Sequence, residues 1–163
     1  MRRKTKGSIG EKSRKILPAF FMILVAGICS CFFYQLMLIQ GESMEPSYHN
    51  MQLVVLNKID RLYQLGDVIA FQCKELNSVL VKRIVAGEGD TAYIRNGTLY
   101  VNGVESLFYP PEAFLYSGLL EEPIQLGKGE YLVIGDNLSE SRDSRYPEVG
   151  VVKTGTIIGK ICR

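Results

Sequence analysis

A run of uncharged, mostly apolar residues near the N-terminus constrains this chain more than any other feature. Residues 16–41 carry no charged side chain, and residues 16–39 form a stretch in which Gln35 is the most polar member. As a helix this stretch would be about 36 Å long, which exceeds the roughly 30 Å hydrocarbon core of a bilayer. We therefore predict one transmembrane helix over residues 16–39.

A cleaved secretion signal is the alternative interpretation of this segment. Such signals have an apolar core of about 7–15 residues and end at small residues. Here the stretch is longer and its end, residues 36–40, reads Leu-Met-Leu-Ile-Gln, which offers no small residue pair for cleavage. We expect a retained, single-pass anchor in the cell membrane.

The charges on either side of the segment predict its orientation. Residues 1–15 hold seven basic residues and one acidic residue, a net charge of +6, and Glu42 and Glu45 follow the apolar stretch. Positive charge favours the cytoplasmic side. We expect 1–15 to be a basic cytoplasmic segment and 40–163 to be an extracytoplasmic domain in contact with the lipid bilayer.

The folded part of the chain does not have the charge of a nucleic-acid-binding protein. The whole chain of 163 residues has a formal charge of +2, but the residues from 42 onward hold 12 basic and 16 acidic side chains, a net of −4. A nucleic-acid binder would carry its basic residues on the folded domain. We expect no nucleic acid among the partners.

The outer segment 40–163 is rich in short β-forming runs separated by turns. Asn96-Gly97 and Asn102-Gly103 are strong hairpin signals, and no stretch shows sustained helical periodicity. We predict a mainly β, mostly antiparallel domain, with residues 109–128, which contain three prolines, as an irregular insertion or long loop. The predicted strands are 52–56, 67–73, 79–85, 91–94, 98–101, 130–134 and 156–161.

The number and spacing of the cysteines and the single histidine do not favour a metal site. Cys29 and Cys31 lie in the apolar span, whereas Cys73 and Cys162 fall in separate predicted strands and form a disulfide only if those strands are neighbours. The chain has no Cys-x-x-Cys pair and one histidine, His49, so we expect no metal site and no cofactor.

The same scarcity of histidine narrows the candidate chemistry. His49 is the one possible base of a Ser-His-Asp triad, and an exposed loop histidine is the better interpretation of it. What remains is a nucleophilic serine or cysteine with a lysine base.

Lys82 and Ser43 are the candidate base and nucleophile. Lys82 shares a strand face with Leu80 and Ile84, so it is either a snorkelling edge residue or a desolvated base, and the residues alone leave both open. Ser43 lies between Gly41 and Pro46 just after the apolar span, where an ordinary polar linker is the alternative.

Four short motifs, in order along the chain, resemble those of bacterial type I signal peptidases, the Ser-Lys membrane proteases that remove signal peptides from exported proteins. Residues 41–47, GESMEPS, are similar to the S-M-x-P-T box, with Ser47 in place of Thr, and residues 66–71, GDVIAF, are similar to G-D-[IV]-V-x-F. Residues 81–90, VKRIVAGEGD, resemble K-R-V-x-G-x-P-G-D, and residues 135–145, GDNLSESRDSR, match G-D-N-x-x-x-S-x-D-S-R.

The resemblance implies a catalytic role for particular residues. Ser43 would be the nucleophile, with its own backbone N–H as an oxyanion donor, and Lys82 would be the general base. Ser141 would hydrogen-bond and orient the Lys82 amine. Some family members add a serine donor two positions before the nucleophile, but this chain has Gly41 there.

The resemblance also implies supporting and substrate-binding residues. Asp143 would pair with Arg145 and hold the Ser141 loop, and Gly135 would let the backbone pack closely against the site. The signal peptide of an exported preprotein would lie as an added strand between residues 37–40 and 80–82. Shallow pockets for its small side chains would be lined by Ile39, Met44, Leu80 and Val81.

The implied fold is the family's coiled antiparallel β-sheet peptidase domain behind one N-terminal transmembrane helix. Two other functions compete. The apolar span disfavours a soluble, self-cleaving regulator of the repressor-protease type. An inactive or specialised relative that assists pilus or surface-protein assembly is disfavoured because Ser43, Lys82, Ser141 and Asp143 are all present. The oligomeric state stays open.

Overall fold

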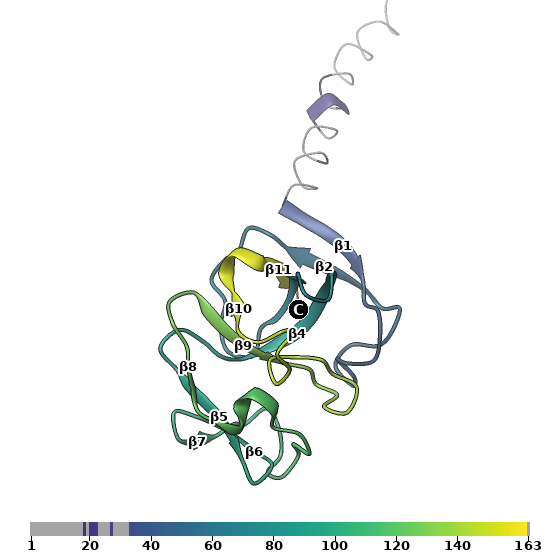
Figure 1. The fold of residues 1–163 in the computed structure, drawn as a ribbon. Coiled ribbons are helices and arrows are strands. Elements are labelled where there is room, and N and C mark those ends of the chain that lie inside the picture. The colour runs from purple at the N-terminus through teal and green to yellow at the C-terminus, as the bar shows by residue number, and fades with distance from the viewer. Residues whose placement is uncertain (1–17, 19, 23–26, 28–32, 163) are drawn as a thin grey trace, which may run out of the picture.

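The computed structural model describes residues 18, 20–22, 27 and 33–162, whose strands form two antiparallel β-sheets (Figure 1). The larger sheet has the strand order β1-β2-β11-β3-β4-β9-β10, and the smaller has the order β7-β6-β5-β8 and forms a separate lobe. The strands of the larger sheet are β1 (Tyr34–Leu38), β2 (Leu53–Asn57), β3 (Val68–Cys73), β4 (Ser78–Ala86), β9 (Glu130–Ile134), β10 (Val152–Lys153) and β11 (Ile157–Ile161). Those of the smaller sheet are β5 (Thr91–Arg95), β6 (Thr98–Val101), β7 (Val104–Glu105) and β8 (Ile124–Gln125).

The prediction of a mainly β, antiparallel domain is confirmed. The seven predicted strands coincide with β2, β3, β4, β5, β6, β9 and β11 to within one residue at each end. The two Asn-Gly pairs form the turns on either side of β6, with φ of 50° at Asn96 and 54° at Asn102, followed by glycines that also have positive φ. Asparagine and glycine reach this left-handed region at the least steric cost, which is why these pairs end strands so clearly.

The end of the predicted membrane helix is wrong. Tyr34–Leu38 forms the edge strand β1, which pairs with β2 in antiparallel register from Tyr34↔Asn57 to Leu38↔Leu53. A short apolar run can form either a buried helix or a strand, so hydropathy alone did not reveal that residues 34–38 form a strand.

Half of the predicted span 16–39 and all of the basic segment 1–15 lie outside the described residues. Within the described residues, no helix combines the length and the apolar character needed to cross a membrane.

The predicted insertion 109–128 is irregular over most of its length but contributes to the core. It contains the 3₁₀ helix η1 (Gly118–Glu121) and the short strand β8, while η2 (Thr154–Thr156) lies between β10 and β11. The insertion buries four side chains against residues of β4, β5, β6 and β9. These side chains are Tyr109, Phe114, Leu120 and Leu126. Short strands β7 and β10 were also not predicted.

The possible disulfide between Cys73 and Cys162 is not formed, and both residues are free thiols. Their strands are neighbours, but β3 and β11 run antiparallel with Phe71 opposite Ile157 and Ile69 opposite Lys160. Cys73 therefore lies at one end of this pair of strands and Cys162 at the other.

Replacing Leu120 by Ala is expected to lower the free energy of unfolding by about 2–5 kcal/mol, because Leu120 is fully buried in η1. The neighbouring Leu119 is 40% exposed, so Leu119→Ala should cost less than about 1 kcal/mol. Urea unfolding of the two variants measures both values. Equal losses would mean that the insertion does not belong to the core.

Candidate active site

Ser43 and Lys82 meet in the structure, although they come from distant parts of the chain. The amine Nζ of Lys82, on β4, donates a hydrogen bond to Oγ of Ser43 at 2.6 Å. Ser43 lies in the loop between β1 and β2, which we call the nucleophile loop (residues 41–48). This contact is the arrangement that a serine nucleophile with a lysine base requires.

The nucleophile loop is shaped by a glycine, a side-chain cap and one buried side chain. Gly41 has φ of +89° and its N–H donates to the side-chain oxygen of Asn50 at 3.0 Å. Met44 is 1% exposed and packs into the core cluster that includes Ile39 and Leu56. Because Met44 fixes the loop from below, its neighbour Ser43 is held half-buried at the surface of the core.

Lys82 is a buried amine rather than a snorkelling one. Its side chain is 3% exposed, and burial lowers its pKa from the ordinary 10.5 to about 8. The nearby carboxylates of Asp143 and Asp136 oppose that shift, since negative charge favours the ammonium form. Desolvation outweighs them, so a large fraction of Lys82 is neutral and able to accept a proton at mildly basic pH.

A groove of about 340 Å³ runs past Ser43 and Lys82 between β1 and β4. All four residues predicted to bind substrate line it: Ile39, Met44, Leu80 and Val81. β1 is the last strand of the larger sheet, and β4 pairs with β9 only from Arg83 onward. In the part of the chain that the structure describes, both strands therefore turn an open backbone edge toward the groove.

A buried ion pair holds the loop that follows β9. The Asp143 carboxylate accepts hydrogen bonds from Nε and Nη2 of Arg145 at 2.8 and 2.9 Å, and both side chains are almost fully buried. The same carboxylate accepts the backbone N–H of Gly135 at 3.2 Å. These bonds tie the two ends of the loop together beside Ser43 and Lys82.

Gly135 stands where no side chain fits. A Cβ at this position would lie 2.5 Å from the carbonyl oxygen of Ser43 and would overlap Oγ of Ser141. The absence of a side chain therefore allows the 135–145 loop to approach the backbone of Ser43.

The predicted hydrogen bond from Ser141 to Lys82 is not formed. Oγ of Ser141 is buried and makes no hydrogen bond to any described residue. The Lys82 amine is directed at Ser43 instead. His49, as expected, is an exposed loop residue, and its Nδ1 lies 3.5 Å from the Glu45 carboxylate.

Two residues that bridge the site were not predicted, Arg83 and Asp136. Arg83 makes a two-pronged ion pair with Asp136, with N···O distances of 2.7 and 2.5 Å. It also donates to the Gly66 carbonyl at 2.8 Å and to Oγ of Ser47 at 3.2 Å. Arg83 thereby links all four motif segments. Its position next to Lys82 in one of these motifs is the sequence signal that could have identified it as a site residue.

Two further hydrogen bonds connect the 135–145 loop to its surroundings. The backbone N–H of Asn137 donates to the Ser43 carbonyl at 3.1 Å. The Tyr109 hydroxyl donates to the Gly135 carbonyl at 3.2 Å. Burial raises the pKa of Tyr109, so this hydroxyl stays protonated and remains a donor.

Comparison with known proteins gives consistent matches. The family described as signal peptidase, peptidase S26, matches residues 13–162. Signal peptidase I P of Bacillus subtilis subsp. natto is 31% identical over 153 residues, which cover 87% of this chain and 81% of that protein. Signal peptidase I of Bacillus caldolyticus is 31% identical over 168 residues, 93% of this chain and 90% of that protein. A crystal structure of a signal peptidase I from Enterococcus faecalis V583 is 28% identical, with a TM-score of 0.49 over 61% of this chain and 97% of that chain.

Replacing Asp143 by Asn is expected to cost about 3–5 kcal/mol of unfolding free energy, because it leaves the buried Arg145 without a counter-charge. The control is Lys153→Gln, which breaks the ion pair with Glu130 by removing a side chain that is 72% exposed. That change should cost less than about 1 kcal/mol. Denaturant unfolding measures the free energy of unfolding of both variants. Similar losses of unfolding free energy in the two variants would contradict the role of the buried pair.

Proposed function

This chain belongs to the signal peptidase family, peptidase S26, and is a serine endopeptidase that removes signal peptides; on that premise we propose that Ser43 is its nucleophile and Lys82 its general base. The observation that carries the proposal is the 2.6 Å contact between the Ser43 hydroxyl and an amine that is 3% exposed. A serine is a weak nucleophile unless an adjacent base takes its proton.

The reaction proceeds by proton transfer and acyl transfer. The neutral Lys82 amine takes the proton of the Ser43 hydroxyl while Oγ attacks the carbonyl carbon of the scissile peptide bond. The resulting ammonium gives this proton to the departing nitrogen, so the C–N bond breaks and an ester to Ser43 remains. The neutral amine then takes a proton from a water molecule, whose oxygen attacks the carbonyl carbon of the ester. The ammonium returns this proton to Oγ of Ser43 as the ester bond breaks, which restores the serine hydroxyl and the neutral amine and releases the signal peptide with a free carboxyl group.

The oxyanion that forms during attack is stabilised by the backbone N–H of Ser43. In the described part of the chain this N–H donates no hydrogen bond, so it is available to the substrate. A donor fixed in place before the reaction is worth more than one that must reorient. Gly41 supplies no second side-chain donor, so the backbone has the larger share of this task.

The substrate binds as an extended strand in the groove between β1 and β4. Both strands have open backbone edges there, and main-chain hydrogen bonds to such edges are a common mode of peptide binding. Ile39, Met44, Leu80 and Val81 line the groove, and its moderate size favours small side chains just before the cut.

Ser141 positions the Lys82 amine during the reaction. Its buried hydroxyl has no partner among the described residues, and a buried unsatisfied hydroxyl is costly to maintain. The ammonium that forms after proton transfer has three N–H donors, one more than the neutral amine, and Ser141 accepts one of them.

An apolar face on β1 and β2 places the domain against the membrane. Leu36 lies opposite Val55 and Leu38 lies opposite Leu53 in the strand register, and all four side chains are exposed. A contiguous exposed apolar patch marks an interaction surface. We assign this face to the lipid, with the residues before β1 as the anchor, the N-terminus in the cytoplasm and the catalytic domain outside.

Ser43→Ala and Lys82→Met are each expected to abolish preprotein cleavage. Methionine has about the length of lysine and no charge to bury, so Lys82→Met should keep or raise the melting temperature while activity is lost. Lys74→Met is the matched control: because Lys74 is exposed, this variant should retain full activity. Cleavage by purified Lys82→Met above a few per cent of the original rate would refute the dyad.

The rate of cleavage should rise with pH through about 8, because burial lowers the pKa of Lys82 to about 8 and only the neutral amine accepts the serine proton. The curve should level off above this pKa. The measurement is kcat/KM for one peptide from pH 6 to 10.5. Full activity at pH 6, or an increase that begins only near the pKa of free lysine, about 10.4, contradicts a desolvated base.

A further inference from the structure

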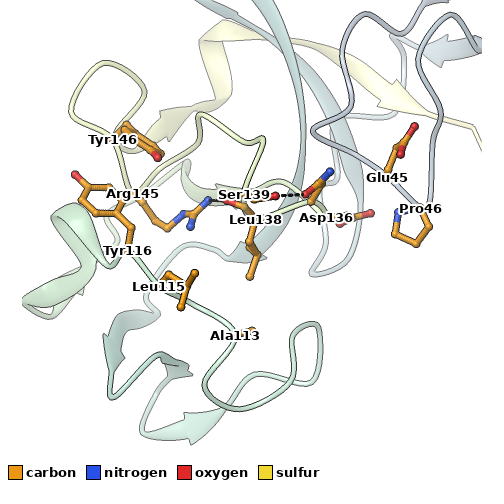
Figure 2. Close-up of a pocket in the computed structure, with 11 residues that line it drawn as sticks. Glu45, Pro46, Ala113, Leu115, Tyr116, Asp136, Leu138, Ser139, Arg145 and Tyr146 are labelled. Atoms are coloured by element: carbon orange, nitrogen blue, oxygen red, sulfur yellow. Dashed lines mark hydrogen bonds between the residues drawn. The ribbon is translucent and has the colours of Figure 1, made fainter.

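A second pocket, larger than the groove, borders the nucleophile loop. Its volume is about 630 Å³, against about 340 Å³ for the groove. Figure 2 shows Glu45 and Pro46 of the nucleophile loop on one side, Leu115 on another, and Leu138 between them. Its size is within the range of pockets that hold ligands in proteins.

The pocket and the groove are lined by neighbouring residues of the nucleophile loop. Ser43 and Met44 line the groove, and the next two residues of the same loop line the pocket. Asn137, another residue of the pocket wall, donates its backbone N–H to the Ser43 carbonyl. A peptide whose scissile bond lies at Ser43 therefore has one depression on each side of the cut.

The lining of the pocket is partly apolar: six of its eleven residues are aliphatic or aromatic, and the others are polar or charged. Tyr116 and Tyr146 lie with ring centroids 5.0 Å apart, and Leu115 stands fully exposed beside them. Pro46, Ala113 and Leu138 complete the apolar part of the lining. Such a surface suits a large aliphatic or aromatic side chain, whereas the smaller groove suits small ones.

The charged residues that line the pocket, Glu45, Asp136 and Arg145, have a net charge of −1. Of the charged residues in its wall, Arg145 is paired with Asp143, and Asp136 is paired with Arg83. Glu45 remains, and its ionic contact in the described residues is with the exposed His49. An acidic side chain entering here would meet a carboxylate of like charge.

We propose that this pocket binds the part of the preprotein that follows the cleavage site. It selects a large apolar or aromatic side chain within the first few residues of the mature protein and disfavours an acidic one there. The inference rests on the proposed function, since it assumes that the peptide bond is cut at Ser43.

The test compares two peptides that share the sequence before the cut. The short peptide ends at the first residue after the cut, and the long one continues for several residues that include a phenylalanine. With the full chain in detergent, kcat/KM should be about tenfold higher for the long peptide. Leu115→Glu should lower this long-to-short ratio about tenfold, because it places a second carboxylate in the apolar wall.

The matched control is Leu107→Glu. Leu107 is as exposed as Leu115 and lies in the same lobe but outside the pocket, so the ratio should stay unchanged. Replacing the phenylalanine of the long peptide by aspartate should bring the ratio close to one. A ratio near one for the unmodified chain, or equal ratios for Leu115→Glu and Leu107→Glu, overturns the proposal.

A binding measurement separates this proposal from the proposed function. A fluorescent peptide that contains only the residues after the cut should bind to the Ser43→Ala chain, about tenfold more weakly when Leu115→Glu is added, and equally well with Leu107→Glu. Absence of binding overturns the pocket whether or not cleavage occurs. Binding that responds to Leu115→Glu supports the pocket even if neither peptide is cut, and that failure would then fall on the dyad.

Discussion

Lys82 is held 3% exposed with its amine 2.6 Å from the Ser43 hydroxyl, and an amine in this position is costly to keep charged. The pKa of Lys82 falls from its ordinary 10.5 to about 8 in the fold. This difference corresponds to a loss of about 3 kcal/mol in the stability of the folded chain at neutral pH. Between these two values the unfolded chain binds more protons than the folded chain, so stability rises with pH over that window. The fold bears this cost to keep a proton acceptor beside the nucleophile.

The ion pairs around the dyad explain how the fold tolerates this cost. Arg83, on β4, is tied to the 135–145 loop by its ion pair with Asp136 and to the nucleophile loop by its hydrogen bond to Ser47. Asp143–Arg145 ties the ends of the 135–145 loop. The same charges act on the base, since Asp143 and Asp136 raise the pKa of Lys82 and Arg145 lowers it. Burial is nevertheless the dominant influence, and it lowers the pKa. Position and basicity of Lys82 therefore depend on one set of contacts.

Much of the fold could be predicted because its signals are local: strand periodicity and Asn-Gly turns place seven strands. β1 was missed because residues 34–38 are as apolar as the segment before them, and only pairing with β2 shows that they form a strand. Ser43 and Lys82 were predicted from motifs. Arg83 and Asp136 also lie in motifs, but they are 53 positions apart, and nothing in either motif shows that the two residues form a pair. The prediction of a hydrogen bond between Ser141 and Lys82 was wrong, because it depended on the direction of the Lys82 amine, which is directed at Ser43.

The central claim is that Lys82 is an uncharged base at mildly basic pH, and its own titration tests this most directly. The chain is labelled with ¹³C at the lysine ε carbons, and the Lys82 signal is identified as the one missing from Lys82→Met. We predict that this signal titrates near pH 8, as burial lowers the pKa of Lys82 to about 8, well below the pKa of free lysine, about 10.4. A Lys82 signal that titrates near the pKa of free lysine would contradict the account.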